Sequence, residues 1–421
     1  MDKRLLVVSL IAALATAGQE PEVTAWTNGR WFDGAAFVRT DVYTAGGKLT
    51  LTRPRNISHT VDIEGGYVTG AFGEAHNHNI PAPDSDASLR MYLERGIFSV
   101  MIQGNVPEAP AALRGRVNVE GGVDVAFSNG LFTAPGGHPS ALVARNIAGG
   151  YMTARDLDGG FLHPVASGAD IERAWRRDID PQKPDFIKMV LVYSEDRAAG
   201  LPRPASGDRH GLDPSLAPEI VRRARASRLR VSAHVESAYD FQVAVDAGVD
   251  LIAHLPGFWP DPARIAEKGI DIYRIDPAVA ARAGRRGVIA VTTVGEALQY
   301  VADKPELQAL MMELYRYNLG VLQENGVTIA IGSDQFRSTS VEEALEIHKA
   351  GLLPPPALLR ALSIDTPRAI FPLRQAHGLV EGAPADFLVL DGDPLADFTA
   401  IQRIRLRVKH GVTIGDQAPR F

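Results

Sequence analysis

The stretch LRVSAHVESAYDFQVAVDAGVDLIAH, residues 229–254, decides the fold of this chain. It contains an apolar run that ends near His234, then the helical pattern 241–247, then a second short apolar run that ends at His254. A strand, a helix and a strand in this order predict a βαβ unit, in which the two strands are parallel. Each of the two strands therefore carries a histidine at its carboxyl end.

The same alternation of apolar runs and helical patterns extends through the middle of the chain. Further strands are expected at 97–102, 186–192, 288–293 and 327–331, and further helices at 108–114 and 216–226. Roughly 300 residues of such units fit a closed (β/α)8 barrel, which typically needs ~250 residues. The alternative is an open doubly wound sheet, but no glycine-rich phosphate-binding fingerprint follows an early strand. The sequence therefore predicts an α/β protein built on a TIM barrel.

The two ends of the chain have a different pattern, in which short apolar stretches are separated by turns. Asn28-Gly29 and Asp33-Gly34 are turn signals within residues 22–70. Near the carboxyl end, 385–390 and 404–412 have the pattern of strands. We expect small antiparallel β structure in the first of these regions and similar strands in the second.

The bulk composition is that of a soluble globular protein, with 45% hydrophobic and 22% charged residues. A net charge of −6 provides no basic surface for nucleic acid and no polybasic patch for a membrane. The sequence has no cysteine, which excludes disulfides, thiolate zinc sites and a cysteine nucleophile. Any metal must therefore be bound by histidine, carboxylate or a modified side chain.

Residues 1–17 have the pattern of a cleaved signal peptide. A basic start at Lys3 and Arg4 precedes a largely apolar run, and small residues at the end of that run offer cleavage sites. The run is shorter than the ~20 residues that a membrane-spanning helix needs, so no stable membrane insertion is expected after cleavage. An N-terminal anchor or a buried helix is the alternative. We expect a secreted or periplasmic protein whose mature chain begins near Thr16 or Gly18.

The segment GEAHNH, residues 73–78, is the first candidate for chemistry. It follows the apolar run 67–72, and alternate residues of a strand face the same side, so His76 and His78 are expected to point together. Two converging imidazoles suit a borderline-soft cation such as zinc. An isolated His-x-His pair is a weak signal, because two structural or exposed histidines also explain it.

Polar residues at the ends of other predicted strands strengthen that signal. Asp334 ends a strand, as His234 and His254 do, and Lys188 lies inside the apolar run 186–192. Catalytic groups of barrels come from the carboxyl ends of several strands, and a buried lysine is rare without a partner. For each residue alone, a core histidine or, at Asp334, a helix N-cap is the alternative.

With these residues in the order His-x-His, Lys, His, His and Asp, the chain resembles the amidohydrolase superfamily, in particular its prolidase-like and imidazolonepropionase-like branch with two metal ions. The resemblance covers essentially the whole mature chain. The segments that carry it are 74–78, 185–188, 232–234, 252–254 and 331–334, and the closing segments 378–382, 385–390 and 393–395.

The resemblance implies a role for each of these side chains. His76 and His78 hold the more buried of two divalent metal ions together with Asp334, and the more exposed ion is held by His234 and His254. Lys188, carboxylated by CO2, bridges the two ions. Zinc is the first choice of metal, with manganese and cobalt as alternatives.

The resemblance also implies a domain organisation. Residues 22–70 and 378–415 are expected to fold together into a small β-sandwich. This sandwich lies beside a TIM-barrel domain of residues 71–377.

These roles predict hydrolysis of an amide bond in a small molecule such as a dipeptide or an N-acyl amino acid. A metal-bridging hydroxide attacks the carbonyl that one metal polarises, and Asp334 is the proton shuttle to the leaving group. The alternatives are a lactone, carbamate or phosphotriester hydrolase on the same binuclear site, or a catalytically silent binding protein. The silent protein is expected to lack a ligand or the aspartate, whereas all six positions are present here. Assembly into a homo-oligomer is left open.

Four further residues are candidates for substrate contact. His138 follows a Pro-Gly-Gly turn that lets the backbone approach a ligand closely, and Tyr193 follows the strand of Lys188. Gln103 and Thr293 end two other predicted strands. An ordinary loop position for His138 and core packing for Tyr193 are the alternatives.

Overall fold

The computed structural model of the protein describes residues 22–80, 85–201, 209–374 and 377–414. The signal peptide predicted for residues 1–17 lies outside the described residues and stays a prediction. Within the described residues, no helix is both long enough and apolar enough to cross a membrane.

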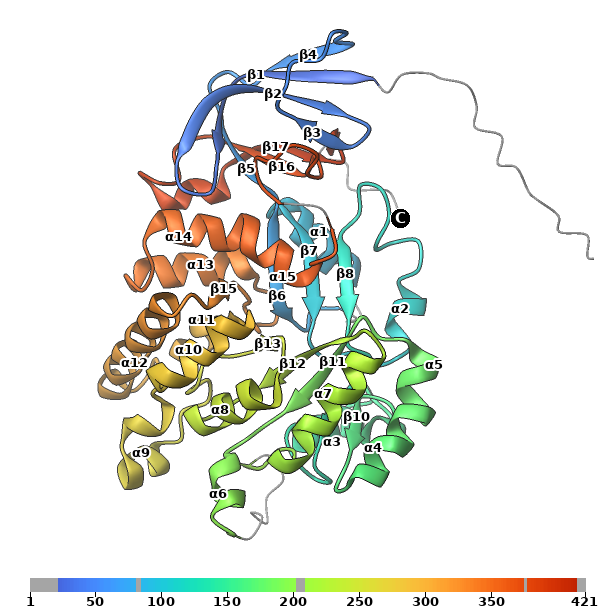
Figure 1. Ribbon diagram of the computed structural model, residues 1–421, viewed down its shortest axis with the longest axis vertical. Coiled ribbons are helices and arrows are strands. Elements are labelled where there is room, and N and C mark those ends of the chain that lie inside the picture. Colours follow the sequence, from blue (N-terminus) through green and yellow to red (C-terminus); the bar gives the residue numbers. More distant parts are fainter. Residues whose placement is uncertain (1–21, 81–84, 202–208, 375–376, 415–421) are drawn as a thin grey trace, which may run out of the picture.

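Strands from both ends of the chain form one sheet, which lies at the top of Figure 1. The antiparallel pairing of β5 with β16 joins the two ends of the chain. Trp26 and Trp31 pack against Phe387, with ring centroids 5.0 Å apart in both pairs. The strands are β1 (Val23–Phe32), β2 (Phe37–Ala45), β3 (Lys48–Thr50), β4 (His59–Asp62), β5 (Tyr67–Gly70), β16 (Phe387–Leu390), β17 (Ile404–Lys409) and β18 (Val412–Ile414). The two-layer sandwich and the domain limits stay predictions.

The middle of the chain forms two sheets in which every pairing is parallel. The larger sheet has the order β10-β9-β11-β12-β13-β14-β15, and the smaller has the order β6-β7-β8. The strands are β6 (Phe72–Asn77), β7 (Ile97–Ile102), β8 (Asp124–Phe127), β9 (Leu131–Thr133), β10 (Leu162–Pro164), β11 (Phe186–Val190), β12 (Arg230–His234), β13 (Leu251–Ile252), β14 (Ile289–Val291) and β15 (Thr328–Ala330). The predicted α/β class with parallel strands is confirmed.

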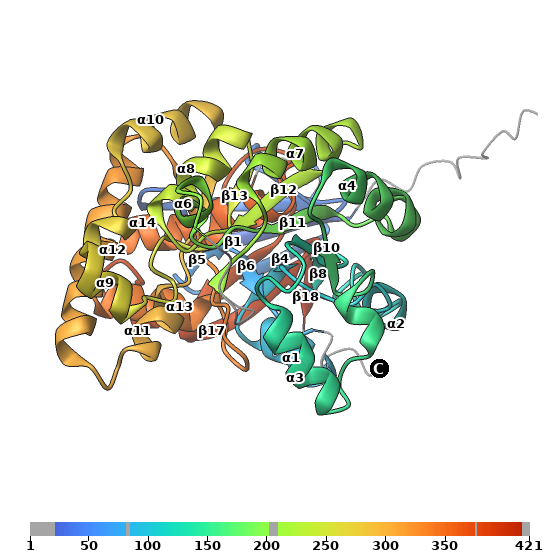
Figure 2. The same ribbon diagram turned by 90° about the horizontal axis from the view of Figure 1, so that it is seen from below.

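Helices follow most of these strands and surround them in the view of Figure 2. They are α1 (Ser85–Glu94), α2 (Ala109–Ala112), α3 (Ser140–Ala148), α4 (Gly168–Ala174), α5 (Asp180–Gln182), α6 (Ser194–Ala198), α7 (Ala217–Ala226), α8 (Ala238–Ala247), α9 (Pro262–Lys268), α10 (Pro277–Arg286), α11 (Val294–Tyr300), α12 (Pro305–Glu324), α13 (Ser340–Lys349), α14 (Pro355–Arg360) and α15 (Thr366–Ile370).

The stretch 229–254 folds as the βαβ unit that its pattern predicts. β12 and β13 pair in parallel, and α8 connects them. Ser237 caps α8, because its side chain accepts a hydrogen bond from the backbone N–H of Asp240. The helix ends at Gly248, whose φ of 88° is a conformation that glycine adopts without strain.

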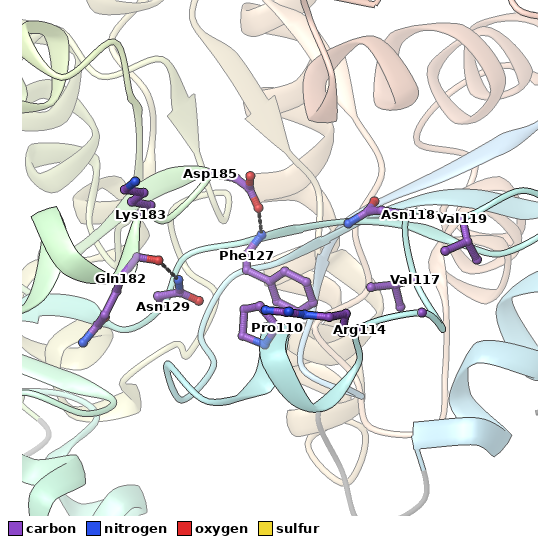
Figure 3. A pocket seen from close by; sticks show the side chains of 11 residues that line it. Pro110, Arg114, Val117, Asn118, Val119, Phe127, Asn129, Gln182, Lys183 and Asp185 are labelled. Atoms are coloured by element: carbon purple, nitrogen blue, oxygen red, sulfur yellow. Dashed lines mark hydrogen bonds between the residues drawn. The ribbon is translucent and has the colours of Figure 1, made fainter.

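Isolated hydrogen bonds join the two parallel sheets at two places. At the first place, Ala75 N–H donates to the carbonyl of Ile331 over 2.9 Å. At the second place, Asp185, just before β11, donates its N–H to Phe127 O at the end of β8 over 2.9 Å. Phe127 N–H donates back to the Asp185 carboxylate over 2.8 Å, which is the bond drawn in Figure 3. Among the described residues these bonds do not continue into ladders, so no closed sheet is found and the predicted barrel is not confirmed.

Candidate metal centre

One cavity of about 440 Å³ collects the polar residues that end the parallel strands. These residues come from β6, β11 and β12 and from the segments just after β13 and β15, so both parallel sheets contribute. All six residues predicted as metal ligands line this cavity: His76, His78, Lys188, His234, His254 and Asp334.

The Asp334 carboxylate lies where three of the imidazoles converge. His76 Nε2 is 3.5 Å and His78 Nε2 is 3.2 Å from Asp334 Oδ1, and His254 Nε2 is 3.7 Å from Asp334 Oδ2. The ligand atoms of His76, His254 and Asp334 all lie within 4.8 Å of one another. Imidazole nitrogens and a carboxylate gathered at this distance can hold a divalent cation.

Hydrogen bonds on the far side of each ring select the nitrogen that faces the centre. His76 Nδ1 lies 2.9 Å from the carbonyl of Ala253, and His78 Nδ1 lies 3.3 Å from the carbonyl of Gly104. A carbonyl only accepts, so in both histidines Nδ1 carries the proton and Nε2 presents its lone pair toward Asp334. His254 Nδ1 likewise has a partner, Thr293 Oγ1 at 3.0 Å.

Burial keeps the imidazoles of His76, His234 and His254 uncharged. It lowers the pKa of His76 and of His254 well below the usual range, and it lowers the pKa of His234 to about 3. A neutral imidazole is the form that binds a metal. The three rings are therefore ready to act as ligands at neutral pH.

Glu236 is a residue of the site that the sequence reading missed. One carboxylate oxygen lies 2.9 Å from His234 Nε2, and the other accepts a hydrogen bond from Trp259 N–H over 3.2 Å. This leaves Nδ1 as the nitrogen of His234 that is available to a metal. The signal was present, since Glu236 follows His234 by two residues, as His78 follows His76.

Lys188 is buried on β11, where its Nζ donates to Gln103 Oε1 over 3.2 Å. Gln103 is oriented in turn by its own donation to the carbonyl of Ala75 over 3.0 Å. Burial lowers the pKa of Lys188 to about 7, although Asp334 acts in the opposite direction. A substantial fraction of this amine is therefore uncharged at neutral pH.

Asp334 combines an unusual backbone with an ionised side chain. Its φ of 50° lies in the left-handed region, which aspartate and asparagine tolerate better than most residues. Its N–H donates to the carbonyl of His76 over 2.8 Å. Burial acts to raise the pKa of Asp334, but the pKa is nevertheless lowered to about 2, so the carboxylate is ionised at neutral pH.

Glu74 supports the two segments that carry these ligands, and the sequence reading gave it no role. Its carboxylate accepts hydrogen bonds from His76 N–H at 3.0 Å, from Ser333 N–H at 3.0 Å and Oγ at 2.9 Å, and from Ser340 N–H at 2.6 Å. Burial raises the pKa of Glu74 to about 8, although these donors act in the opposite direction. The hydrogen bonds that Glu74 accepts hold the strand of His76 against the segment that precedes and follows Asp334.

The four candidates for substrate contact divide into two pairs. Gln103 and His138 line the cavity, and the His138 ring stacks on His234 with centroids 4.9 Å apart. Tyr193 and Thr293 are not among the residues that line it. The Tyr193 hydroxyl lies 3.0 Å from that of Tyr273, and Thr293 contacts the far side of His254.

Comparisons with known proteins give structural relatives only. Neither protein-family models nor curated protein sequences match the chain. Among solved structures, a prolidase complexed with N-methylphosphonate-L-proline is 20% identical with a TM-score of 0.69, and the match covers 94% of this chain and 100% of that one. The ochratoxinase of A. niger is 19% identical with a TM-score of 0.72, covering 96% of this chain and 99% of that one.

A Xaa-Pro dipeptidase with methionine bound in its active site is 16% identical with a TM-score of 0.70, over 93% of this chain and 99% of that one. The structural neighbours are thus the prolidase-like and amidohydrolase proteins that the resemblance predicted. At these identities the likeness establishes a shared fold.

Proposed function

We propose that this chain is a metal-dependent hydrolase of amide bonds in small molecules. The observation that carries the proposal is the convergence of His76, His78, Lys188, His234, His254 and Asp334 in one cavity. These six residues come from five strands or strand ends that are spread over residues 76–334. Packing alone does not account for four histidines, a lysine and an aspartate that share one cavity.

The donor set fits two divalent metal ions. We assign His76, His78 and Asp334 to one ion and His234 and His254 to the other, with zinc as the first choice because the donors are imidazole and carboxylate. Lys188 lies in the same cavity, and its uncharged amine is the form that reacts with CO2 to give the carboxylated, bridging side chain. Metals bound there supply Lewis acidity and lower the pKa of water.

Asp334 is the residue that we assign to proton transfer. Its ionised carboxylate accepts a proton from the attacking water and delivers it to the leaving nitrogen, so that the carbon–nitrogen bond breaks with a neutral amine as product. His138 stands on the cavity wall against His234 and is assigned to the orientation of the substrate. The buried carboxylate of Glu74 keeps the segments of His76 and Asp334 in fixed positions during these steps, because it accepts hydrogen bonds from both.

We further propose that the two parallel sheets belong to one closed (β/α)8 barrel beside a β-sandwich formed by both ends of the chain. In this barrel β8 and β9 are halves of one strand, interrupted at Asn129 and Gly130, whose φ values are 50° and 100°. β8 pairs with β7 and β9 pairs with β11, so the interrupted strand passes from one sheet to the other. The structural neighbours and the hydrogen bonds between β6 and the segment after β15 support closure.

The basic and apolar pattern of residues 1–17 supports a further part of the proposal, that the hydrolase is secreted or periplasmic. Expression of the full chain with analysis of the amino terminus of the product tests this directly. A mature protein that begins near Thr16 or Gly18 is expected.

Elemental analysis and an amide hydrolysis assay together test the hydrolase proposal. The protein is incubated with zinc and bicarbonate, passed through a desalting column and measured for bound metal and for turnover of small amides. We expect close to two zinc ions per chain, with activity that is lost on chelation and restored by metal. A protein that binds no metal under these conditions contradicts the proposal.

Lys188→Ala is expected to lower the metal content toward one ion or fewer per chain. The reason is that the bridging anion is lost while all four histidines remain. The matched control is Lys349→Ala on α13, whose side chain is 79% exposed, and it is expected to keep the wild-type metal content. Elemental analysis of both variants after the same bicarbonate treatment gives the answer, and unchanged stoichiometry in Lys188→Ala argues against the bridge.

A further inference from the structure

The ionisable side chains that line the cavity affect which substrate charge it accepts. Apart from its histidines, the ionisable side chains among the described lining residues include Lys188, Glu296 and Asp334, and no arginine is among them. Lys188 is already hydrogen-bonded to Gln103. The half-buried Glu296 adds a second carboxylate to that of Asp334.

Much of the remaining wall is apolar. α3 and the segments after it contribute Leu142, Val143, Met152 and Phe161. Phe258 adds an aromatic ring, which stacks against His254 with ring centroids 3.9 Å apart. An apolar wall of this kind binds apolar groups of a ligand, whereas the few polar groups fix its orientation.

The mouth of the cavity carries large aromatic side chains that face water. Tyr151 is 76% exposed, Phe336 is 73% exposed and Trp259 is 39% exposed, and all three are lining residues of this cavity. Their segments are far apart in the sequence, so one local feature of the chain does not explain them. Exposed apolar residues gathered at one opening are characteristic of a binding surface.

We propose that the substrate is an uncharged amide with a large apolar group, and not a peptide or N-acyl amino acid with a free carboxylate. This inference rests on the proposed function and deepens it. The apolar group lies between α3 and Phe258 and reaches the aromatic mouth, with the amide carbonyl at the metal centre. Away from the metal ions of the proposed function, which the histidines and Asp334 would hold, a substrate carboxylate finds no arginine among the described lining residues and meets the carboxylate of Glu296. Two like charges that lie next to each other in a partly desolvated site cost binding free energy.

A matched pair of substrates tests the charge preference. The 4-carbamoylanilide and the 4-carboxyanilide of 4-phenylbutanoic acid share the scissile anilide bond and one apolar group, and the leaving aniline is neutral in the first and anionic in the second. Release of 4-phenylbutanoic acid is the readout, so cleavage of the primary amide of the carbamoyl compound is not counted, and the rates of alkaline hydrolysis of the two anilides correct for their different intrinsic reactivity. With the zinc- and bicarbonate-loaded protein, we expect kcat/KM to be at least about tenfold higher for the neutral compound. Equal values, or a preference for the carboxylate, overturn the inference.

Single substitutions test whether residues of this cavity cause the preference for a neutral, apolar substrate. Glu296→Gln is expected to raise the ratio of kcat/KM for the carboxyanilide to kcat/KM for the neutral compound several-fold. Tyr151→Ser and Phe336→Ser are expected to raise KM for the neutral compound several-fold, because contact area at the mouth is lost. Val412→Ser on β18 is the matched control for an exposed apolar side chain, being 55% exposed and outside the cavity lining. Mouth variants that behave like this control overturn the assignment of the apolar group to the mouth.

Equilibrium dialysis measures the binding of the two anilides to the same metal-loaded protein. It distinguishes failure of the hydrolase proposal from failure of the inferred substrate class. If neither compound is hydrolysed, the hydrolase proposal fails for these amides, but tighter binding of the neutral compound still supports the inferred substrate class. Tighter binding of the carboxylate, equal binding, or no binding of either compound contradicts it.

Discussion

Replacing Asp334 with asparagine is expected to lower kcat for amide hydrolysis by about 10²–10⁴-fold, the usual contribution of a positioned acid–base group. The metal content is expected to stay near that of the wild type. The amide of asparagine is close in size to the carboxylate and its oxygen can still face the metals, but it neither accepts a proton from water nor delivers one to the leaving nitrogen. Turnover and elemental analysis on the same preparations measure both quantities.

Asparagine is the informative replacement because of the backbone at this position. With a φ of 50°, Asp334 is in the left-handed region, where asparagine is tolerated and alanine is strained. Asp271→Asn serves as a control for the chemical change itself, since the Asp271 side chain is 78% exposed. If Asp334→Asn retains near-normal kcat with full metal content, another group moves the proton.

Glu74→Ala is expected to destabilise the protein by on the order of 4 kcal/mol, near the upper end of single substitutions. It leaves the backbone N–H groups of His76, Ser333 and Ser340 without their acceptor, and each buried unpaired donor costs roughly 1–3 kcal/mol. It also opens a cavity where the side chain was. Chemical denaturation of the two proteins at one metal loading measures the difference in the free energy of unfolding. Glu313→Ala on α12, where the glutamate is exposed, is the control and is expected to stay within about 0.5 kcal/mol.

Glu74→Gln separates the charge from the hydrogen bonds. The glutamine oxygen can keep the donors at His76 and Ser333, whereas its NH2 group meets the N–H of Ser340, so a loss of roughly 1–3 kcal/mol is expected. The folded-state pKa of about 8 lies above the ordinary value of 4.5, so between these pH values the folded protein binds a proton that the unfolded chain has released. The contribution of Glu74 to stability therefore falls as the pH rises from about 4.5 to about 8. Glu74→Gln is expected to show a flatter profile than the wild type over this window, and an equally steep one contradicts the assignment.

Local sequence patterns by themselves determined the elements and the ligand candidates. The apolar runs before His234 and His254 and the helical pattern between them appear as β12, α8 and β13. The alternation of side chains along a strand is a short-range property, so the pair His76 and His78 could be predicted without any knowledge of the fold. For the same reason Glu236 was within reach of the sequence, two residues after His234.

Only the tertiary structure decided which side chains share a cavity and what holds them there. Tyr193 and Thr293 follow strands just as Asp334 does, yet the cavity lining includes Asp334 and neither of them. Glu74 receives donors from Ser333 and Ser340, which lie more than 250 residues away in the sequence, and no local pattern reports a contact of that separation.

The apolar character of the cavity was decided in the same way. In the sequence, Tyr151, Trp259 and Phe336 cannot be told apart from ordinary surface or core residues. Their common position at one opening appears only in the folded chain. Periodicity fixes the direction of a side chain relative to its own strand or helix. The neighbours across a cavity depend on how those elements pack, which is a property of the whole chain.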